Sequence, residues 1–364
     1  MSRYDVAIVG AGIAGASLAA EVAGAASVLL IEAEELAGYH STGRSAAFWS
    51  ETYGGPLVQP LTSASGPLLA EGGFLTQRGA LHIADAHGRG ALEALVEEFR
   101  GSAVQLRKLG RAELEQRIDG LKPGWDWAVE EPSCADIDVA GLHSACLKRA
   151  KILGATLVTG APLSRAQRRA GGWQIEAGEK AFEASILVDA AGAWADAVAE
   201  LAGVRRIGIQ PYRRTIAQLR VDPPTRPGLP LVIDAAGGFY FKPEAGGRLW
   251  LSPHDETPCP PCDCAAEEYD VALAIDRLEG AVDWRVERVE RSWAGLRSFA
   301  PDRLPVYGFD SGEPGFFWFA GQGGFGIQTA PAAAMVAAAL VSGAAPDSAV
   351  AHIDPAPYAP GRFR

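Results

Sequence analysis

The sequence predicts an α/β protein of two domains, one of them assembled from separated segments. Three observations predict this class. Residues 4–32 have the pattern of a strand, a glycine turn, a helix and a second strand. Residues 210–299 are rich in β-forming runs separated by Pro and Gly, which favours a mainly antiparallel sheet. Residues 316–343 return to a strand, a glycine loop and an alanine-rich helix, so the first domain is expected to be discontinuous.

The first of these segments contains a glycine-rich turn, in "YDVAIVGAGIAGASLAAEVA". Gly10, Gly12 and Gly15 have the spacing GxGxxG, which permits a tight turn, close approach of the backbone to a pyrophosphate and tight packing of helix on strand. The second strand ends at Glu32, where a carboxylate can accept hydrogen bonds from ribose hydroxyls. Strand, turn, helix, strand and acid occur in order, so we predict a Rossmann-like dinucleotide-binding unit.

The remaining segments divide between the two domains. Residues 81–134 carry two charged, amphipathic helix patterns and are expected to form an inserted module. Helix and strand patterns resume from residue 135, and Thr329 and Pro331 mark the expected start of the last helix. The predicted nucleotide-binding domain comprises residues 1–80, 135–209 and 300–364, and the predicted second domain comprises residues 81–134 and 210–299.

Composition excludes several classes of function. The 364 residues are 48% hydrophobic and 21% charged, which excludes bulk disorder. The net charge of -11 offers no attraction to nucleic acid or anionic lipid. Five cysteines do not form a disulfide framework in so long a chain, and glycines interrupt the apolar stretch at residues 6–20. We therefore expect a cytoplasmic protein without a transmembrane segment or a nucleic-acid partner.

Five segments carry a family resemblance: "VAIVGAGIAGASLA", "GYHSTGRSAA", "LVDAAGAWAD", "WAGLRSFAPDRLPVYG" and "GQGGFGIQT". In this order they resemble the flavin-dependent D-amino acid oxidase superfamily, which includes glycine oxidase, and within it the bacterial D-amino acid dehydrogenases of the D-arginine type. The resemblance implies FAD on a discontinuous Rossmann-like domain of the glutathione-reductase type. It also implies that an eight-stranded type of mixed sheet covers the substrate.

The resemblance assigns the cofactor site to three glycine segments and one loop. Residues 40–46 would lie along the pyrophosphate and the isoalloxazine, where small side chains let backbone amides reach FAD and Arg44 offers a compensating charge. The amides before the last helix would face the charge that builds on the flavin as hydride arrives. The implied contacts are Gly10, Gly12, Ile13, Ala14, Gly15, Glu32, Ser41, Thr42, Arg44, Ser45, Ala46, Ala47, Ala191, Gly192, Trp194, Gly323, Gly324, Gly326, Ile327, Gln328 and Thr329.

The resemblance also implies a substrate side. Arg297 matches the arginine that binds the substrate carboxylate, because a guanidinium pairs with a carboxylate in bidentate fashion. Tyr240 matches a tyrosine that assists the same carboxylate, and Arg214 and Tyr53 are further candidates. Tyr53 would lie on a mobile loop with Gly54 and Gly55 as hinges. Each of these side chains also has an ordinary structural explanation, as a surface ion pair or a core aromatic.

Phe48 departs from the family pattern, because close relatives often have histidine there. A phenyl ring cannot accept a proton. A free amine tolerates that loss, whereas a hydroxyl must be deprotonated as hydride leaves, so Phe48 favours amines over 2-hydroxy acids. His40 and His254 are alternative bases, although each is also explained as a loop histidine.

The cysteines raise two questions about cofactors. Cys259, Cys262 and Cys264 lie near His254 in "HDETPCPPCDC", which are the residue types of a zinc site, but the irregular spacing and the prolines lead us to expect no metal. The segment at residues 295–308 lacks the cysteine that links flavin covalently in part of the wider family. FAD is therefore expected to be non-covalent.

The predicted function is FAD-dependent oxidation of a D-amino acid by hydride transfer from Cα to flavin N5, which gives an imine and then a 2-oxo acid. Arginine-preferring relatives have acidic groups where this chain has Ala80 and Gly237, so a neutral or apolar substrate is expected. Apolar surface is expected from Phe48, Trp49, Phe239 and Tyr240. Three alternatives stay open: a secondary-amine oxidase of the sarcosine, glycine or opine type, a 2-hydroxy acid dehydrogenase, and a flavin-binding subunit inert without its partner. The electron acceptor is equally open between oxygen, a quinone and another carrier.

Overall fold

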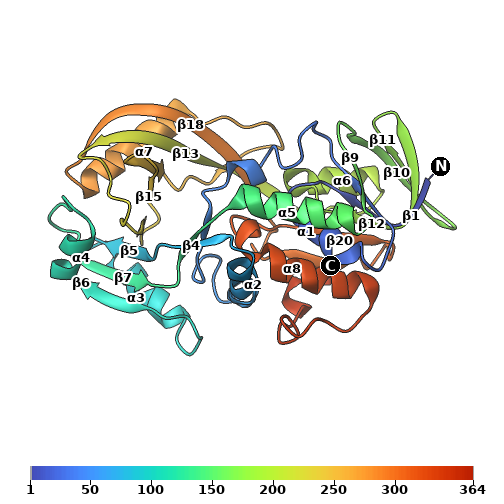
Figure 1. The fold of residues 1–364 in the computed structure, drawn as a ribbon, viewed down its shortest axis with the longest axis horizontal. Helices are drawn as coiled ribbons and strands as arrows, with labels where there is room; N and C mark the ends of the chain where they lie inside the picture. The colour runs from blue at the N-terminus through green and yellow to red at the C-terminus, as the bar shows by residue number, and fades with distance from the viewer. Residues whose placement is uncertain (1, 364) are drawn as a thin grey trace.

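The computed structural model describes residues 2–363, which form two large β-sheets in two lobes along the long axis of the molecule and a smaller third sheet (Figure 1). The first sheet has eight strands, and parallel pairing joins β9, β2, β1, β12 and β20. Its strands are β1 (Ser2–Val9), β2 (Val28–Ile31), β9 (Thr156–Val158), β10 (Leu163–Arg169), β11 (Gly172–Ala177), β12 (Lys180–Asp189), β19 (Val306–Phe309) and β20 (Phe316–Ala320).

Both faces of this sheet are buried. Val6 and Ile8 of β1 pack in one core with α1 and α8, while the alternate residues Ala7 and Val9 pack in a second core with α6. Such two-sided burial is typical of parallel sheets and explains the nearly continuous apolar runs in the sequence. The helices of this lobe are α1 (Ile13–Val22), α5 (Val139–Ile152), α6 (Ala195–Leu201) and α8 (Gly326–Ser342).

The second sheet has nine strands, in the order β17-β13-β16-β15-β14-β5-β7-β6, with β18 also paired to β13. All its pairs are antiparallel except β14 with β5, which confirms the predicted mainly antiparallel class. Its strands are β5 (Ala80–Ala84), β6 (Arg107–Gly110), β7 (Trp127–Glu131), β13 (Gln210–Asp222), β14 (Leu231–Asp234), β15 (Tyr240–Glu244), β16 (Arg248–Ser252), β17 (Thr257–Pro258) and β18 (Arg285–Phe299).

One helix of the second lobe was not predicted. Helix α7 (Glu268–Ala281) interrupts the region expected to be wholly β, and its Val271, Ala274 and Leu278 pack on the outer face of the sheet. These three residues have helical spacing, and acidic residues lie in the first turn of the helix. The sequence therefore contained a helix pattern, but the neighbouring β patterns were stronger. The other helices of this lobe are α3 (Arg89–Glu98) and α4 (Arg111–Arg117).

Smaller elements join the lobes. A three-stranded sheet contains β3 (Phe48–Trp49), β4 (Leu75–Gln77) and β8 (Ala135–Ile137), and α2 (Gln59–Glu71) packs on α8. Helix α8 begins at Gly326, earlier than the predicted start at Thr329, because the Thr329 amide already donates to the carbonyl of Phe325. Pro331 therefore lies inside α8. The 3₁₀ helices are η1 (Thr42–Arg44), η2 (Gly192–Trp194), η3 (Ala356–Tyr358) and η4 (Pro360–Phe363).

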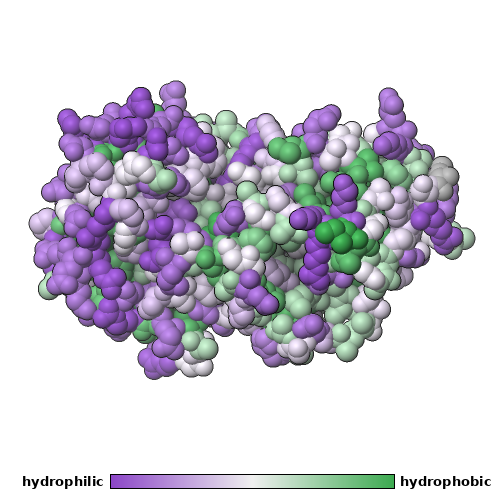
Figure 2. Space-filling model, in the orientation of Figure 1, coloured by the Kyte–Doolittle hydropathy of each residue, from purple (hydrophilic) through white to green (hydrophobic). Residues whose placement is uncertain are grey.

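The surface differs between the lobes. On the face in Figure 2, hydrophilic residues cover most of the lobe that contains β5–β7 and β13–β18, whereas hydrophobic residues form small patches on the other lobe. Exposed apolar side chains there include Ile152, Leu153 and Leu157, near the edge strand β9. Across residues 2–363, no helix has both the length and the apolar character needed to cross a bilayer.

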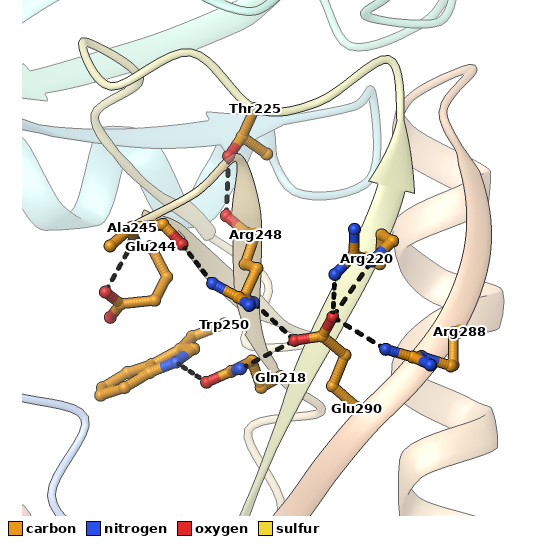
Figure 3. Close-up of polar contacts among 9 residues, drawn as sticks. All are labelled: Gln218, Arg220, Thr225, Glu244, Ala245, Arg248, Trp250, Arg288 and Glu290. Atoms are coloured by element: carbon orange, nitrogen blue, oxygen red, sulfur yellow. Dashed lines mark hydrogen bonds and ion pairs between the residues drawn. The ribbon is translucent and has the colours of Figure 1, made fainter.

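A polar cluster around Glu290 joins three strands of the second sheet (Figure 3). The Glu290 carboxylate accepts hydrogen bonds from Arg220 (2.6 Å), Arg248 (2.5 Å) and Gln218 (3.1 Å). These strands are β18, β13 and β16, so one carboxylate fastens the long β13–β18 ribbon to its neighbour. Hydrogen bonds from Arg220 first, and then from Gln218 and Arg248, lower the pKa of the Glu290 carboxyl to about 2.

Acid is expected to weaken this cluster. A carboxyl whose folded-state pKa is lowered contributes stability above its ordinary pKa and loses that contribution as the pH falls toward the lowered value. The melting temperature of wild type should therefore fall more than that of Glu290→Gln between about pH 5 and about pH 3. Calorimetry across this range provides the measurement, with Glu287→Gln, an exposed neighbour on the same strand, as control. Parallel pH profiles for wild type and Glu290→Gln would contradict the prediction.

Candidate functional site

A cavity of about 370 Å³ lies at the carboxyl ends of the parallel strands. Ligands of parallel α/β sheets bind at this edge. The lining residues come from the ends of β1, β2 and β12, the N-terminus of α1, the loop at residues 38–45, the 3₁₀ helix η2, the end of β18 and the loop before α8. A cavity of this volume, lined by segments from both ends of the sequence, is large enough to hold part of a dinucleotide.

The glycine turn lines one side of this cavity. Gly10 has φ +100°, and a Cβ there would lie 2.5 Å from the carbonyl oxygen of Ala190. A Cβ on Gly15 would lie 1.8 Å from the carbonyl oxygen of Gly10. Gly12 precedes the first turn of α1, whose amides are free of helical partners. The turn therefore brings backbone and a helix N-terminus against the cavity, as a bound pyrophosphate requires.

Glu32 supports the same turn. One carboxylate oxygen accepts from the Ala11 amide (2.9 Å) and the other accepts from the Glu34 amide (3.1 Å). Each oxygen has a second lone pair, and Glu32 lines the cavity. The residue can therefore fix the turn and still accept hydrogen bonds from a ribose.

Most residues predicted to contact the cofactor line this cavity. They are Gly10, Gly12, Ile13, Ala14, Glu32, Ser41, Thr42, Ser45, Ala191, Gly192, Trp194, Gly323, Gly324, Gly326 and Ile327. Gly15 lies behind the turn. Thr329 is fully buried, and its hydroxyl donates to the carbonyl of Phe325 (2.9 Å).

Arg44 is placed differently from the prediction. Its guanidinium lines neither this cavity nor the smaller one described below. It pairs with Asp263 and donates to the backbone carbonyls of Cys264 (2.9 Å) and Ala294 (3.2 Å). The Asp263 carboxylate and these two carbonyls, all distant in the sequence, hold the guanidinium outside the cofactor cavity. Arg44 therefore connects its loop to the second lobe.

The lining residues that were not predicted include two groups outside the segments assigned to the cofactor. Residues 161–163 follow β9, and Ala197, Val198 and Leu201 belong to α6. Because β9 is parallel to β2, its carboxyl end must lie beside Glu32 at the same edge of the sheet. That rule could have located residues 161–163 from the sequence.

A second, small cavity of about 20 Å³ adjoins the large one, and Ser45, Arg297, Gly324 and Ile327 line both. All five residues predicted for the substrate side line it. They are Phe48, Tyr53, Arg214, Tyr240 and Arg297. Ala46, Ala47 and Gln328, predicted as cofactor contacts, also line this cavity and not the large one.

The register of the second sheet brings the two arginines together. Arg297 of β18 is opposite Tyr212 of β13, so Arg214, two residues further on, projects from the same face. Arg214 is opposite Gly295, and a Cβ on Gly295 would lie 3.0 Å from a guanidinium nitrogen of Arg297. The glycine therefore leaves space for the Arg297 side chain.

Arg297 is 7% exposed, and within residues 2–363 no acidic side chain pairs with it. Its two guanidinium hydrogen bonds are long, 3.3 Å each, to the carbonyls of Leu296 and Arg44. Burial first, and the nearby Arg214 charge as well, lower the pKa of Arg297 below its ordinary value. Arg214, which is 3% exposed, donates to the carbonyl of Asp255 and to Glu256. No carboxylate lines the small cavity, so of its two arginines Arg214 has an acidic partner outside the lining and Arg297 has none among residues 2–363.

Three aromatic rings close the cavity. The Phe48 ring lies 5.5 Å from that of Tyr53 and 5.9 Å from that of Tyr240, measured between centroids. Neither phenolic hydroxyl has a hydrogen-bond partner among the described residues, 2–363. Trp49 and Phe239 do not contribute, because strand alternation turns each into a core on the opposite side from Phe48 and Tyr240. The apolar lining is therefore smaller than predicted.

The loop that carries Tyr53 is held by hydrogen bonds at residues 50–53. The Gln328 amide nitrogen donates to the carbonyls of Ser50 and Tyr53, both at 3.1 Å. Buried Glu131 accepts from the Thr52 hydroxyl (2.6 Å) and the Glu51 amide (2.6 Å). Burial alone would raise the pKa of Glu131, but hydrogen bonds from His82, Thr52 and Ser50 lower it below its ordinary value. These bonds hold Tyr53 against the cavity, and the predicted mobility of this loop stays a prediction.

Neither candidate histidine lines the small cavity. His40 lies in the large cavity with Nε2 2.8 Å from a Glu34 oxygen. Burial, followed by the Arg214 charge, lowers the pKa of His254 to about 3, so its ring is a weak base. Within residues 2–363 no three His, Cys, Asp or Glu side chains come close enough to hold a metal ion.

The Rossmann-like sheet and the glycine turn define a protein class that binds a dinucleotide, here beside a small pocket lined by two arginines. Residues 5–340 match the family model DAO, described as FAD dependent oxidoreductase, and the chain belongs to this family. Its cofactor is FAD, and the close approach at Gly10, Gly12 and Gly15 fits it.

Several known proteins are similar to this chain, which spans between about a third and two thirds of the length of the curated relatives it matches. Hydrogen cyanide synthase subunit HcnC of Pseudomonas aeruginosa is 26% identical over 293 residues, which are 78% of this chain and 66% of that protein. Glycine oxidase from Geobacillus kaustophilus has the same fold, with a TM-score of 0.86 at 23% identity over 99% of this chain and 98% of that one. L-proline dehydrogenase from P. horikoshii also has a TM-score of 0.86, at 21% identity over 100% of this chain and 98% of that one. The finer likeness to D-arginine-type dehydrogenases stays a prediction.

Proposed function

We propose that this FAD-dependent oxidoreductase oxidises a small amine that carries a carboxylate, and that its preferred substrate is a D-amino acid with a neutral or apolar side chain. The observation that carries the proposal is Arg297, a buried guanidinium without an acidic partner in residues 2–363, in a pocket that adjoins the FAD cavity. A buried cation is costly unless an anion pairs with it, so this pocket favours a carboxylate ligand.

The pocket residues would divide the work of binding. Arg297 would bind the carboxylate through two parallel N–H bonds, and the free hydroxyls of Tyr53 and Tyr240 could donate to its remaining lone pairs. The Phe48 ring would contact the apolar part of the substrate. FAD, when bound in the adjoining cavity, supplies the acceptor for a hydride from the substrate carbon. Exclusion of water by the three rings would strengthen the ion pair at Arg297.

The absence of a base in the pocket lining supports an amine over an alcohol. The lining contains no histidine, aspartate or glutamate. A neutral amine needs no proton acceptor as the carbon loses hydride, and the resulting imine is hydrolysed by water to a 2-oxo acid and ammonia. A hydroxyl would need a positioned base, which makes a 2-hydroxy acid the weaker candidate.

A substrate of the sarcosine, glycine or opine type is the second candidate. The small cavity, about 20 Å³, favours a compact ligand. The similar proteins named above include a glycine oxidase and an L-proline dehydrogenase, whose substrates are a small amino acid and a cyclic secondary amine. Sarcosine and proline therefore belong in any test beside D-amino acids.

Cationic substrates are expected to react slowly. Two guanidiniums and no carboxylate line the pocket, so the side chain of D-Arg or D-Lys would meet like charge. Glu51 does not relieve this, because Ser63 and Ser133 hold its carboxylate outside the pocket. Burial of a Leu-sized side chain contributes about 1.5 to 3 kcal/mol, whereas an unpaired buried charge costs more, so D-Leu should exceed D-Arg by at least about tenfold in kcat/KM.

Anaerobic flavin reduction without any partner protein provides the measurement. The panel is D-Leu, D-Met, D-Phe, D-Pro, D-Arg and D-Lys, their L-forms, glycine, sarcosine and 2-hydroxyglutarate. Fastest reduction by D-Arg or D-Lys would refute the charge argument. Reduction only by sarcosine or glycine would move the function to the second candidate, and reduction only by the hydroxy acid would refute the amine class. Failure of the whole panel would favour a subunit that depends on a partner.

A further inference from the structure

Three cysteines lie in a loop that the proposed reaction does not use. The loop, residues 259–264, follows the short strand β17, and the Cys259 amide donates to the carbonyl of Pro211 in β13 (3.0 Å). The sulfurs of Cys259 and Cys262 are 3.5 Å apart, and both residues are half-buried. A disulfide has an S–S distance of about 2.05 Å, so a small movement would join them. Exposed Pro260 and Pro261 lie between them, where the chain has space to adjust.

The same loop fastens the loop of the cofactor cavity. Asp263 follows Cys262 directly, and its carboxylate pairs with Arg44 and accepts from the Tyr39 hydroxyl (3.0 Å). The Cys264 carbonyl accepts from Arg44 as well (2.9 Å). Tyr39, Ser41 and Ser45 line the FAD cavity on either side of Arg44. We call residues 262–264 the clasp, because they connect the second sheet to residues 38–45.

We propose that Cys259 and Cys262 form a thiol–disulfide modification site, oxidised by a peroxide, and that the disulfide tightens the clasp on the FAD cavity. Cys259 is tied to β13 and Cys262 is adjacent to Asp263. A bond between the two sulfurs therefore ties the clasp to the sheet and restricts the motion that would release Arg44.

The peroxide is the oxidant, and it accepts the two electrons that the thiols lose. The Cys262 thiolate attacks one peroxide oxygen, which breaks the O–O bond, leaves a sulfenic acid on Cys262 and releases hydroxide, which takes up a proton to become water. The Cys259 sulfur then attacks the Cys262 sulfur, the S–S bond forms, and the sulfenic oxygen leaves as water with the Cys259 proton. Two thiols lose two electrons in total, and hydrogen peroxide becomes two molecules of water.

The environment favours this order of attack. Burial, and then the hydrogen bond with Cys262, raise the pKa of the Cys259 thiol to about 11, so Cys259 is the poorer first nucleophile. The closed loop would contain only the two prolines between the cysteines, and a short loop gains little from closure, so dithiols should reverse the bond readily.

Thiol mapping on the FAD-loaded protein tests the pairing. After hydrogen peroxide treatment, free thiols are alkylated in denaturant and the peptides are weighed. The peptide that contains Cys259, Cys262 and Cys264 should carry a single alkyl group, on Cys264, and should lack the thiol hydrogens of Cys259 and Cys262, which dithiothreitol should restore. Cys259→Ser should stop at a Cys262 sulfenic acid that dimedone traps, and Cys146→Ser, remote on α5, should behave as wild type. A bridge from Cys262 to Cys264, or oxidation that leaves Cys259 alkylatable, would overturn the proposal.

The release of FAD tests the clasp. The fluorescence of free FAD should rise severalfold more slowly from the oxidised protein than from the reduced one. In Asp263→Ala the disulfide should still form, but the rate of FAD release should no longer depend on it. Equal release rates from oxidised and reduced wild type would refute the tightening. A difference that persists in Asp263→Ala would refute the clasp as its cause.

Discussion

Replacement of Arg297 by methionine is expected to leave FAD bound and to lower kcat/KM for the amine substrate by about 10² to 10³ or more. The substrate carboxylate would then lose its cationic partner in a buried pocket, and removal of one partner from such a pair costs about 3 to 5 kcal/mol. Methionine has a similar length and no charge, so packing near Gly295 should survive. Steady-state kinetics and flavin absorbance measure the two effects.

Two further variants separate binding from folding. Arg297→Lys keeps a positive charge but loses the planar guanidinium, so its kcat/KM should lie between that of Arg297→Met and that of wild type. Arg291→Met removes an exposed arginine of the same strand, which stacks on Trp293, and should change kcat/KM by less than about threefold. A change of less than about threefold in Arg297→Met itself would mean that Arg297 is not the carboxylate anchor.

Local patterns in the sequence were sufficient for much of the fold. The GxGxxG turn at Gly10 predicted the βαβ unit, because its requirements are steric and involve neighbours in the sequence. Alternation predicted the strands around Arg214 and Tyr240, and the antiparallel class of the second sheet followed. The family resemblance, and not a local pattern, assigned to the substrate side the five residues that line the small cavity.

Other features depended on contacts that no local pattern contains. Arg44 lies in the sequence of a cofactor loop, yet its guanidinium pairs with Asp263, more than 200 residues away. Phe239 and Trp49 are apolar and adjacent to pocket residues, but the face on which each lies depends on strand register. The fastening of the Tyr53 loop required Gln328 and Glu131 to meet it from two distant elements. The sequence identified these residues as candidates for the site, but their contacts depend on the fold.

Substitution of Gly15 by alanine is expected to yield a protein with FAD content below about a tenth of the wild-type value, or no folded protein. The added Cβ would lie 1.8 Å from the carbonyl oxygen of Gly10, so the backbone of the turn must open and its amides can no longer approach the pyrophosphate. Two alanine variants form a graded control. At Gly12 the Cβ would lie 3.2 Å from the Thr42 hydroxyl, which can move, so FAD content should be intermediate; at Gly24 the nearest atoms are Leu153 methyls at 3.9 Å, so it should be unchanged. Circular dichroism reports folding, and the absorbance of flavin freed by heat reports FAD, because no covalent link is expected. A folded Gly15→Ala protein with a full complement of FAD would show that the turn does not need the contact that this glycine permits.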